Sequence, residues 1–550
     1  MGSAVFGLWF LTPSVVWPGS TDWLRWGDME FAQYIWQYYR HTPILQWPVT
    51  AVDRYGEGWG TIFPSSAGIA LVGLPLKLIS PILPENFQFL GAWTLSCFVL
   101  QGFFADRLFA HFGLSALERI FGSLSILVAP IFIFRIGMTH FDLSAQWVVL
   151  AGLLLYFKDS VSLPLGRWLI LIAVTICIHI YLFVLVISIG MAWVVKRRVS
   201  GSRQKQLRSG VYSAMMMILT SLVLWWFLGY STFLGQAKGV GFFRLNTLAF
   251  FNPESGSDVA YSHALSRLPL IRNRTFFGEE SEGFGFLGVV GIFGFIALTA
   301  TSRRWFTKQR LRSVGPLLVS AFVLMLVAVS HQIAVARREF ELPIPAVLVD
   351  TRQIFRVAPR FSWLAYYLVL VAGWISLALL LRRGKFGRFT LCGLLLLGMW
   401  DQGSGMMAVR QKLIEAPEKS IDVDTADWNE LAASVSRLYL VPTFDVQDDH
   451  LPRGAEVWEQ NALWRRLIEF SSRHQLTTNF AYVGRPVTRQ VARSNEEIRR
   501  SIAERQVPPR SVLVFADPIE WRSATSHLAG QAVAKELDGL YLLITKGDQG

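Results

Sequence analysis

Long apolar runs recur along this chain from Phe6 to Ala408, and they restrict what it can fold into. A segment that crosses the hydrocarbon layer of a membrane needs about 20 mainly apolar residues. Its backbone polar groups must also pair internally, which for runs of this kind means helices. A hydrophobic content of 52% and a mean hydropathy of +0.39 exceed the usual values for a soluble domain. The sequence therefore predicts a helical protein that spans the membrane many times.

The formal net charge of +13 raises the alternative of a nucleic-acid-binding protein. Lys and Arg, however, gather in short loops between apolar runs, and such loops are typical of the cytoplasmic side of a membrane protein. We therefore expect membrane lipids as partners and no nucleic acid. The three cysteines lie within predicted spans without metal-ligand spacing, which indicates small core residues: Cys97, Cys177 and Cys392.

Basic loops near residues 196–208, 303–312 and 382–388 fix the topology of the second half of the chain. About eleven spans result, with the amino terminus in the cytoplasm and the carboxyl terminus outside. The predicted spans are 4–17, 87–105, 116–134, 141–157, two short helices within 168–195 that meet near His179, 209–229, 284–301, 314–333, 361–381 and 389–407.

Residues 18–86 then form a large first outer loop that contains two helical patterns. The first, at 28–40, reads as amphipathic and aromatic. The second, at 65–80, is apolar but contains Pro75 and Lys77, and we expect it to lie in the membrane interface. If it crosses the membrane instead, the early half of the topology inverts.

The chain changes character after Asp401, where polar residues interleave with β-like runs at 438–441, 511–516 and 540–545. Helical patterns lie between these runs, and the spacing of Ser494 and Glu497 predicts a capping box that opens one of them. We expect residues 408–550 to form an outer, soluble α/β domain. It shows no Gly-rich phosphate loop, so acceptor docking or a structural role is expected of it.

Ionisable side chains at membrane depth are costly and often functional. In this topology they are Asp28, Glu30, His140, Asp142, His179, Glu282, His331, Arg356, Arg360 and Asp401. All fall on the outer side, and none lies near the middle of a span, where coupled transporters usually place ion relays. The pattern indicates chemistry at the outer membrane surface.

Two aspartates allow both a structural and a chemical interpretation. Asp28 follows Gly27 at the start of a helix, so it either caps that helix or accepts a proton from an acceptor hydroxyl. Glu30 is a weaker candidate for the same chemistry. Asp142 either caps the helix that follows it or, with His140, supplies a second acid or part of a metal site with Asp28.

Two arginines also allow both a structural and a chemical interpretation. Arg356 and Arg360 precede an aromatic run at the start of a span, so they either anchor a helix or bind a lipid-linked phosphate. The segment 246–253, followed by Glu282, is either an ordinary outer loop or a cover over a cavity.

Several strings, taken in order, resemble the GT-C superfamily of membrane glycosyltransferases, which use polyprenyl-linked sugars outside the cytoplasm. They are WGDMEFAQYIWQYYR at 26–40, the apolar helix with a proline in the same loop, and RIGMTHFD at 135–142. LNTLAFFNP at 245–253, EGFGFLG at 282–288, RVAPRFSW at 356–363 and HIY at 179–181 are similar to motifs of a bacterial GT-C subfamily. The resemblance covers residues 1–407, which are predicted to be the catalytic membrane domain.

The resemblance implies catalytic roles for Asp28 and Asp142. The residues that it implies in substrate binding are Glu30, Arg40, His140, His179, Tyr181, Asn252, Glu282, Arg356 and Arg360. His140 stands where many members carry an acid, so the resemblance leaves open both a divalent cation, Mg²⁺ or Mn²⁺ at Asp28 and Asp142, and a metal-independent mechanism.

The leading functional prediction is a glycosyltransferase that moves a sugar from a polyprenyl-phosphate donor to a hydroxyl of an envelope glycan, lipid or protein. Asp28 acts as base, with inversion at the sugar, on the outer face of the bacterial inner membrane. Two alternatives stay open: a flippase or transporter of polyprenyl lipids, and a non-catalytic scaffold for envelope assembly.

Overall fold

The computed structural model describes most of the chain, in two compact units built from segments that are distant in sequence. The described residues are 2–25, 27–158, 164–199, 203–232, 243–254, 259–267, 280–305, 307–343, 355, 357–382, 384, 386–415, 425–444, 454–460, 463–485 and 487–546. The first unit contains Met1–Leu24, Pro84–Leu224 and Gly239–Ala416, and the second contains Arg25–Leu83, Trp225–Lys238 and Pro417–Gly550. Residues of the predicted first outer loop thus group with the carboxyl-terminal segment.

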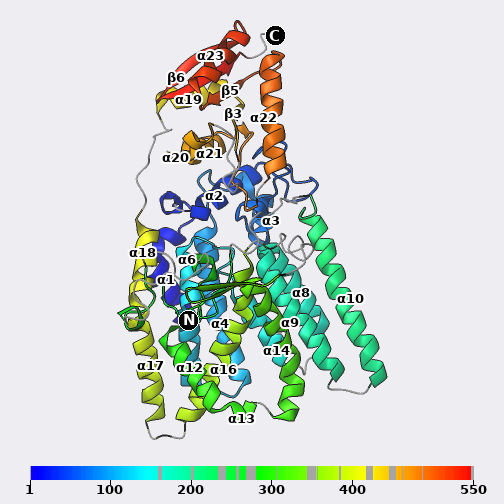
Figure 1. Cartoon of the computed structure of the whole chain (residues 1–550), viewed down its shortest axis with the longest axis vertical. Helices are drawn as coiled ribbons and strands as arrows, with labels where there is room; N and C mark the ends of the chain where they lie inside the picture. Colours follow the sequence, from blue (N-terminus) through cyan, green and yellow to red (C-terminus); the bar gives the residue numbers. More distant parts are fainter. Residues whose placement is uncertain are drawn as a thin grey trace. The chain divides into compact units, whose positions relative to one another are not determined.

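The first unit is a bundle of helices (Figure 1). The helices that lie in it wholly or mostly are α1 Gly2–Val16, α4 Leu90–His111, α5 Ala116–Leu127, α6 Pro130–Gly137, α7 Trp147–Phe157, α8 Pro164–Ile178, α9 Ile180–Val199, α10 Arg203–Phe227, α11 Glu280–Gly283, α12 Gly288–Ala300, α13 Ser302–Trp305, α14 Lys308–Val329, α16 Trp363–Leu381, α17 Gly387–Asp401 and α18 Gly403–Ile414. Short 3-10 turns are η1 Asp22–Leu24, η4 Leu265–Arg267 and η5 Ala358–Ser362. Strands β1 Gln332–Val335 and β2 Arg338–Glu341 form an antiparallel pair.

Five stretches among the described residues are long and apolar enough to cross a membrane. They are Ala116–Gly137, Ile180–Val199, Ser209–Phe227, Arg310–Val329 and Ala358–Leu381. The prediction of a helical, multi-pass membrane protein is confirmed at this level. The number of eleven spans and their orientation stay predictions.

Helices α8 and α9 lie side by side (Figure 1). His179 is the one residue between them. The ring centroids of Trp168 on α8 and Trp193 on α9 are 5.9 Å apart, so the two helices form a hairpin. The prediction of two helices that meet at His179 is confirmed. Two predicted spans are divided between helices: Pro130 begins a new helix, α6, within 116–134, and Gln402 separates α17 from α18 within 389–407.

Helices α12 and α16 approach each other closely at Gly294 and Gly373. A Cβ atom added at Gly373 would lie 2.8 Å from the backbone carbonyl carbon of Gly294, a distance that requires one backbone to move. Small residues at helix crossings permit such contacts in membrane proteins.

We therefore expect Gly373→Ala to lower the free energy of unfolding by about 1–3 kcal/mol, the usual cost of overpacking. Thermal unfolding of the purified protein in detergent measures the effect. Gly393→Ala on α17 is the matched control, because its added Cβ meets nothing within 4 Å. A melting temperature for Gly373→Ala equal to that of the control would contradict the role of this crossing.

The second unit begins with helix α2, Gly27–Tyr39, followed by η2 Phe63–Ser66, α3 Ala70–Leu78 and η3 Ser80–Ile82. Ten of the thirteen residues of α2 are buried, which is more than the amphipathic pattern at 28–40 requires. The physical reason is that α21, Leu463–Arg473, packs against α2 from the carboxyl-terminal segment. Helix α3 has nine residues, about 13.5 Å of helix, which is too short to cross a membrane.

The carboxyl-terminal part of this unit contains a five-stranded mixed sheet in the order β4-β3-β5-β7-β6. The strands are β3 Arg437–Val441, β4 Thr477–Thr478, β5 Ser511–Phe515, β6 Ala532–Leu537 and β7 Leu540–Thr545, and the helices are α19 Ala426–Ser434, α20 Glu456–Gln460, α21, α22 Thr488–Ala503 and α23 Pro518–His527. Strand β3 runs parallel to β4 and β5, whereas β7 runs antiparallel to β5 and β6. The three predicted β-like runs correspond to β3, β5 and β7.

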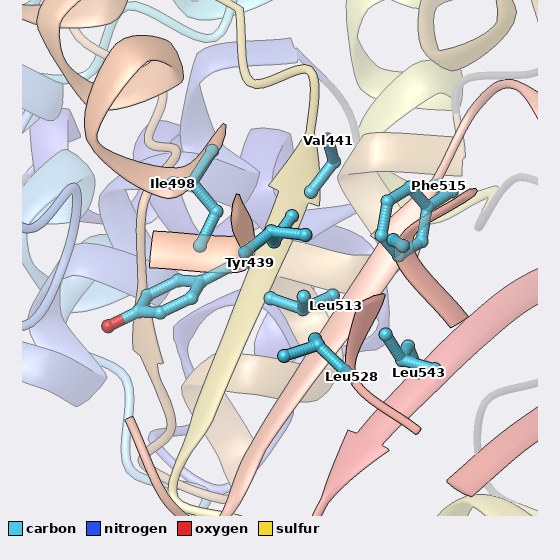
Figure 2. Close-up of a cluster of buried hydrophobic side chains, with 9 residues drawn as sticks. Tyr439, Val441, Ile498, Leu513, Phe515, Leu528 and Leu543 are labelled. Atoms are coloured by element: carbon cyan, nitrogen blue, oxygen red, sulfur yellow. The ribbon is translucent and has the colours of Figure 1, made fainter. Parts of the chain in front are cut away.

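Alternate residues of the central strands point to one face of this sheet and pack against α22 and α23. Figure 2 shows this cluster, which includes Tyr439 and Val441 of β3, Leu513 and Phe515 of β5, and Ile498 of α22. A period of two residues places such side chains on the same face.

One local prediction in this region is wrong. Helix α22 begins at Thr488, so Ser494 and Glu497 lie inside it and do not form a capping box. The buried positions Val491 and Ile498 show why: the apolar stripe that packs on the sheet starts before Ser494 and continues through it.

Candidate functional site

Side chains from several helix ends converge in the first unit. Arg135 lies in the last turn of α6, Asp142 lies in the turn before α7, and His179 lies between α8 and α9. Glu282 belongs to α11, just before α12, and Arg360 belongs to η5, just before α16. Hydrogen bonds and ion pairs link these residues, and we call this group the polar cluster.

Glu282 is held by two guanidinium groups. Its Oε1 accepts from Arg360 Nη2 at 2.9 Å, and its Oε2 accepts from Arg360 Nε at 3.1 Å and from Arg135 Nη1 at 2.7 Å. Arg135 Nη2 also donates to the Glu282 backbone carbonyl at 2.9 Å. All three residues are buried.

The charges of the two arginines decide the ionisation of Glu282. Burial by itself raises the pKa of this carboxyl group, but Arg135 and Arg360 more than offset it and hold the pKa well below its usual range. Glu282 is therefore a carboxylate. Because one carboxylate faces two guanidinium groups, this part of the cluster keeps an excess of positive charge.

Asp142 and His179 form the other part of the polar cluster. His179 Nε2 lies 3.5 Å from Asp142 Oδ2, while Asp142 Oδ1 accepts from the backbone N–H of Leu143 at 2.8 Å. His179 Nδ1 accepts from the backbone N–H of Tyr181 at 3.1 Å. In the neutral imidazole the proton is therefore on Nε2, the nitrogen that faces Asp142.

His140 and Tyr181 complete the cluster. His140 Nδ1 is 3.3 Å from Arg135 Nη1. The Tyr181 ring stacks on His179 with centroids 5.5 Å apart, and the Arg360 guanidinium carbon lies 5.0 Å from the centre of the same ring. The Tyr181 hydroxyl accepts from the backbone N–H of Val357 at 2.8 Å. Tyr181 thus connects the Asp142 side of the cluster to the Glu282 side.

The structure brings together six residues that the sequence named: His140, Asp142, His179, Tyr181, Glu282 and Arg360. It also adds Arg135, which the sequence analysis did not choose. The available signal was a single arginine within the apolar helix PIFIFRIG, just before an outer turn. Of the two alternatives for Asp142, the structure does not show the helix cap, because α7 begins five residues later, at Trp147.

Other named residues of the first unit have local partners. Asn252 Oδ1 accepts from the backbone N–H of Glu254 at 3.2 Å and so closes a turn. Asp401 Oδ1 accepts from Ser262 Oγ at 2.8 Å and from the backbone N–H of Ala264 at 2.9 Å. His331 Nδ1 lies 3.3 Å from Ser330 Oγ. Arg356 lies outside the described residues.

The second unit contains Asp28, Glu30 and Arg40. Helix α2 begins at Gly27, so Asp28 lies in its first turn, where a negative charge is favoured by the helix dipole. Asp28 Oδ1 accepts from the hydroxyl of Tyr482 at 2.7 Å. No sequence pattern marked Tyr482, because it lies in a segment without regular structure.

Glu30 is buried beside Asp28 on the same helix. Its Oε1 accepts from the Tyr34 hydroxyl at 2.9 Å, and its Oε2 lies 3.3 Å from Arg465 Nη1. Burial raises the pKa of Glu30, although the Tyr34 hydrogen bond and Arg465 oppose the shift. Arg40 Nη2 donates to the backbone carbonyls of Ser80 and Leu83 at 2.9 and 2.8 Å, which ties the end of α2 to η3.

The residues present give a limited test of a metal site. Asp142 and His179 lie close enough to supply two donors. Among the described residues, no group of three or more His, Cys, Asp or Glu side chains is arranged to hold a metal ion. Mg²⁺ or Mn²⁺ bound by Asp28 and Asp142 remains a prediction.

Several solved membrane proteins are similar to this chain in structure. ArnT from Cupriavidus metallidurans in the apo state aligns over 98% of this chain and 96% of its own, with 11% identity and a TM-score of 0.47. The Archaeoglobus fulgidus oligosaccharyltransferase tethered to an acceptor peptide aligns over 99% of this chain and 73% of its own, with 10% identity and a TM-score of 0.46. AglB from the same organism, in complex with an inhibitory peptide and a dolichol-phosphate, aligns over 93% and 68%, with 10% identity and a TM-score of 0.42. At TM-scores below 0.5, none of these likenesses assigns an activity to this chain.

Comparison of the sequence with curated proteins gives no match. The family described as "Domain of unknown function (DUF6311)" matches residues 1–403, and the "DUF6311 C-terminal domain" matches residues 427–545. Since the first match alone covers more than half of the 550 residues, this chain belongs to the DUF6311 family.

Proposed function

We propose that this protein is a glycosyltransferase of GT-C type. It transfers a sugar from a polyprenyl-phosphate donor to a hydroxyl of an envelope glycan, lipid or protein. The reaction takes place at the outer face of the bacterial inner membrane, where the carboxyl-terminal domain also lies. The observation that carries the proposal is the polar cluster: buried guanidinium groups beside an aspartate–histidine pair, gathered at the ends of apolar helices.

The donor phosphate is assigned to Arg360. The two bonds to Glu282 use its Nε and Nη2 atoms, which directs Nη1 away from the carboxylate. A guanidinium group held in this way is a fixed donor for a phosphate oxygen. As the sugar leaves, negative charge grows on the phosphate, and a preorganised cation lowers the energy of that transition state.

The acceptor is activated by Asp28, a role that the sequence resemblance implies. The carboxylate takes the proton of the acceptor hydroxyl while the hydroxyl oxygen attacks the anomeric carbon of the sugar. The bond between that carbon and the phosphate oxygen breaks, and its electron pair leaves with polyprenyl phosphate. A single displacement of this kind inverts the configuration. Asp142, which is paired with His179, is the second acid.

The test follows a labelled sugar in proteoliposomes that contain the purified full chain. The liposomes carry polyprenyl-phosphate lipids with a radiolabelled sugar, extracted from labelled bacteria, and an envelope fraction serves as the acceptor. Transfer of label from the lipid to a covalent product supports the proposal. Label that stays on the lipid but changes leaflet identifies a transporter, and label that does neither indicates a scaffold. Liposomes with heat-denatured protein are the control.

A further inference from the structure

The carboxyl-terminal segment contributes a side chain to the surroundings of Asp28 within the second unit. The hydroxyl of Tyr482 donates to Asp28 Oδ1 at 2.7 Å, although the two residues are 454 positions apart in sequence. A hydroxyl that donates to one carboxylate oxygen of an aspartate restricts rotation of the carboxylate about the Cβ–Cγ bond. It also favours the ionised form, which is the form that a base requires.

The ring of Tyr482 is fixed by aromatic stacking. Its centroid lies 4.0 Å from that of Phe31 on α2, with the planes 19° apart. Phe31 in turn stacks on Trp464 of α21, with centroids 5.2 Å apart and planes 9° apart. The guanidinium of Arg465 lies 5.3 Å from the Phe31 ring centre and 5.1 Å from that of Trp464. The ring therefore has little freedom to move its hydroxyl away from Asp28.

The backbone of Tyr482 is also held by the first loop. Its N–H donates to the Tyr55 hydroxyl at 2.9 Å, and its carbonyl accepts from Ser66 Oγ. Two residues later, the N–H of Gly484 donates to the Ser65 carbonyl at 2.7 Å. Two loop residues bond Tyr482 itself and a third bonds Gly484, so the first loop fixes the backbone at this tyrosine.

We infer that Tyr482 is a positioning residue for Asp28, so that the carboxyl-terminal segment completes the catalytic apparatus instead of only docking a partner. The inference rests on the proposed function, because it takes Asp28 as the base. It names a contribution from the carboxyl-terminal segment, for which composition suggested only acceptor docking or a structural role.

The experiment compares Tyr482→Phe with wild type in the labelled-sugar transfer assay. The substitution removes the hydroxyl and keeps the ring that stacks on Phe31. Hydrogen bonds to charged groups contribute enough that a roughly 10- to 100-fold fall in kcat is expected, with KM for the donor lipid unchanged. In the Asp28→Asn background the same change should have no further effect on kcat, because the two groups act as one unit.

Tyr439→Phe is the matched control. The Tyr439 hydroxyl also donates to a carboxylate of the first loop, Oε2 of Glu57, a residue with no role in the proposed reaction. A kcat for Tyr482→Phe equal to wild type would overturn the inference, as would a loss that matches Tyr439→Phe and follows the melting temperature. If Asp28→Asn is inactive while Tyr482→Phe is fully active, only the inference fails. If Asp28→Asn keeps full activity, the proposed base itself fails, and the role of Tyr482 fails with it.

Discussion

Asp28→Asn is expected to lower kcat for sugar transfer by about 10²- to 10⁴-fold, the usual contribution of a general base. The change keeps the size and shape of the side chain, and the amide oxygen can still accept the hydrogen bond from Tyr482. What it removes is the ability to take a proton from the acceptor hydroxyl. The measurement is the initial rate of transfer from labelled polyprenyl-phosphate sugar at saturating donor and acceptor.

Asp53→Asn is the matched control for this experiment. Asp53 lies in the same loop and the same unit, and its side chain is exposed. Its substitution should leave kcat and the melting temperature at wild-type values. Full transfer activity in Asp28→Asn, at an equal amount of folded protein, would remove Asp28 as the base and return the protein to the transporter or scaffold alternatives.

Glu282→Gln is expected to reduce the stability of the helical unit by about 3–5 kcal/mol. Removal of one partner from a buried ion pair leaves the other charge uncompensated, and that penalty is of this size. Here the loss leaves two guanidinium groups, those of Arg135 and Arg360, without their shared carboxylate. Thermal unfolding in detergent, or the yield of folded protein in membranes, measures the effect.

Added polyprenyl phosphate should return part of this lost stability. Its phosphate group supplies the missing negative charge, and a ligand that binds only the folded state raises apparent stability. The matched control is Asp106→Asn, which breaks the half-exposed pair of Asp106 with Arg119, where Oδ1 and Nε are 3.2 Å apart. An exposed pair is worth about 0–1 kcal/mol. Equal melting temperatures for the two variants would show that the polar cluster is not a buried charge network.

Much of the polar cluster could be predicted because its members break an apolar pattern. His179 interrupts a long apolar run, and Glu282 and Arg360 stand directly before helices, so each is conspicuous in the sequence. Their convergence followed from a topology that placed all these helix ends on one side. Arg135 belongs to the same class of signal, but only the structure shows that it lies in the last turn of α6 and bonds Glu282.

The surroundings of Asp28 could not be predicted in the same way. The side chains that contact the first turns of helix α2 include Trp464, Arg465 and Tyr482, which lie more than 400 residues away. Local periodicity carries no information about contacts at such a separation. The aromatic residues of α2 therefore fit an amphipathic pattern, whereas in the structure α21 and its neighbours bury them. Likewise, Ser494 fits the sequence pattern of a helix start, but α22 begins earlier, at Thr488, because its preceding turn also packs on the sheet.

The interleaving of the two units along the chain has a consequence for biosynthesis. The second unit needs residues up to Leu83 and residues after Pro417, and more than 300 residues of the helical unit are made in between. At about 5–20 residues per second, the first loop waits for tens of seconds before its partners leave the ribosome. During that interval the aromatic side chains of α2 lack their cover, and a chain that stops before Pro417 never acquires it. An incomplete copy therefore keeps this helix uncovered, which links the presence of a finished Asp28 environment to completion of synthesis.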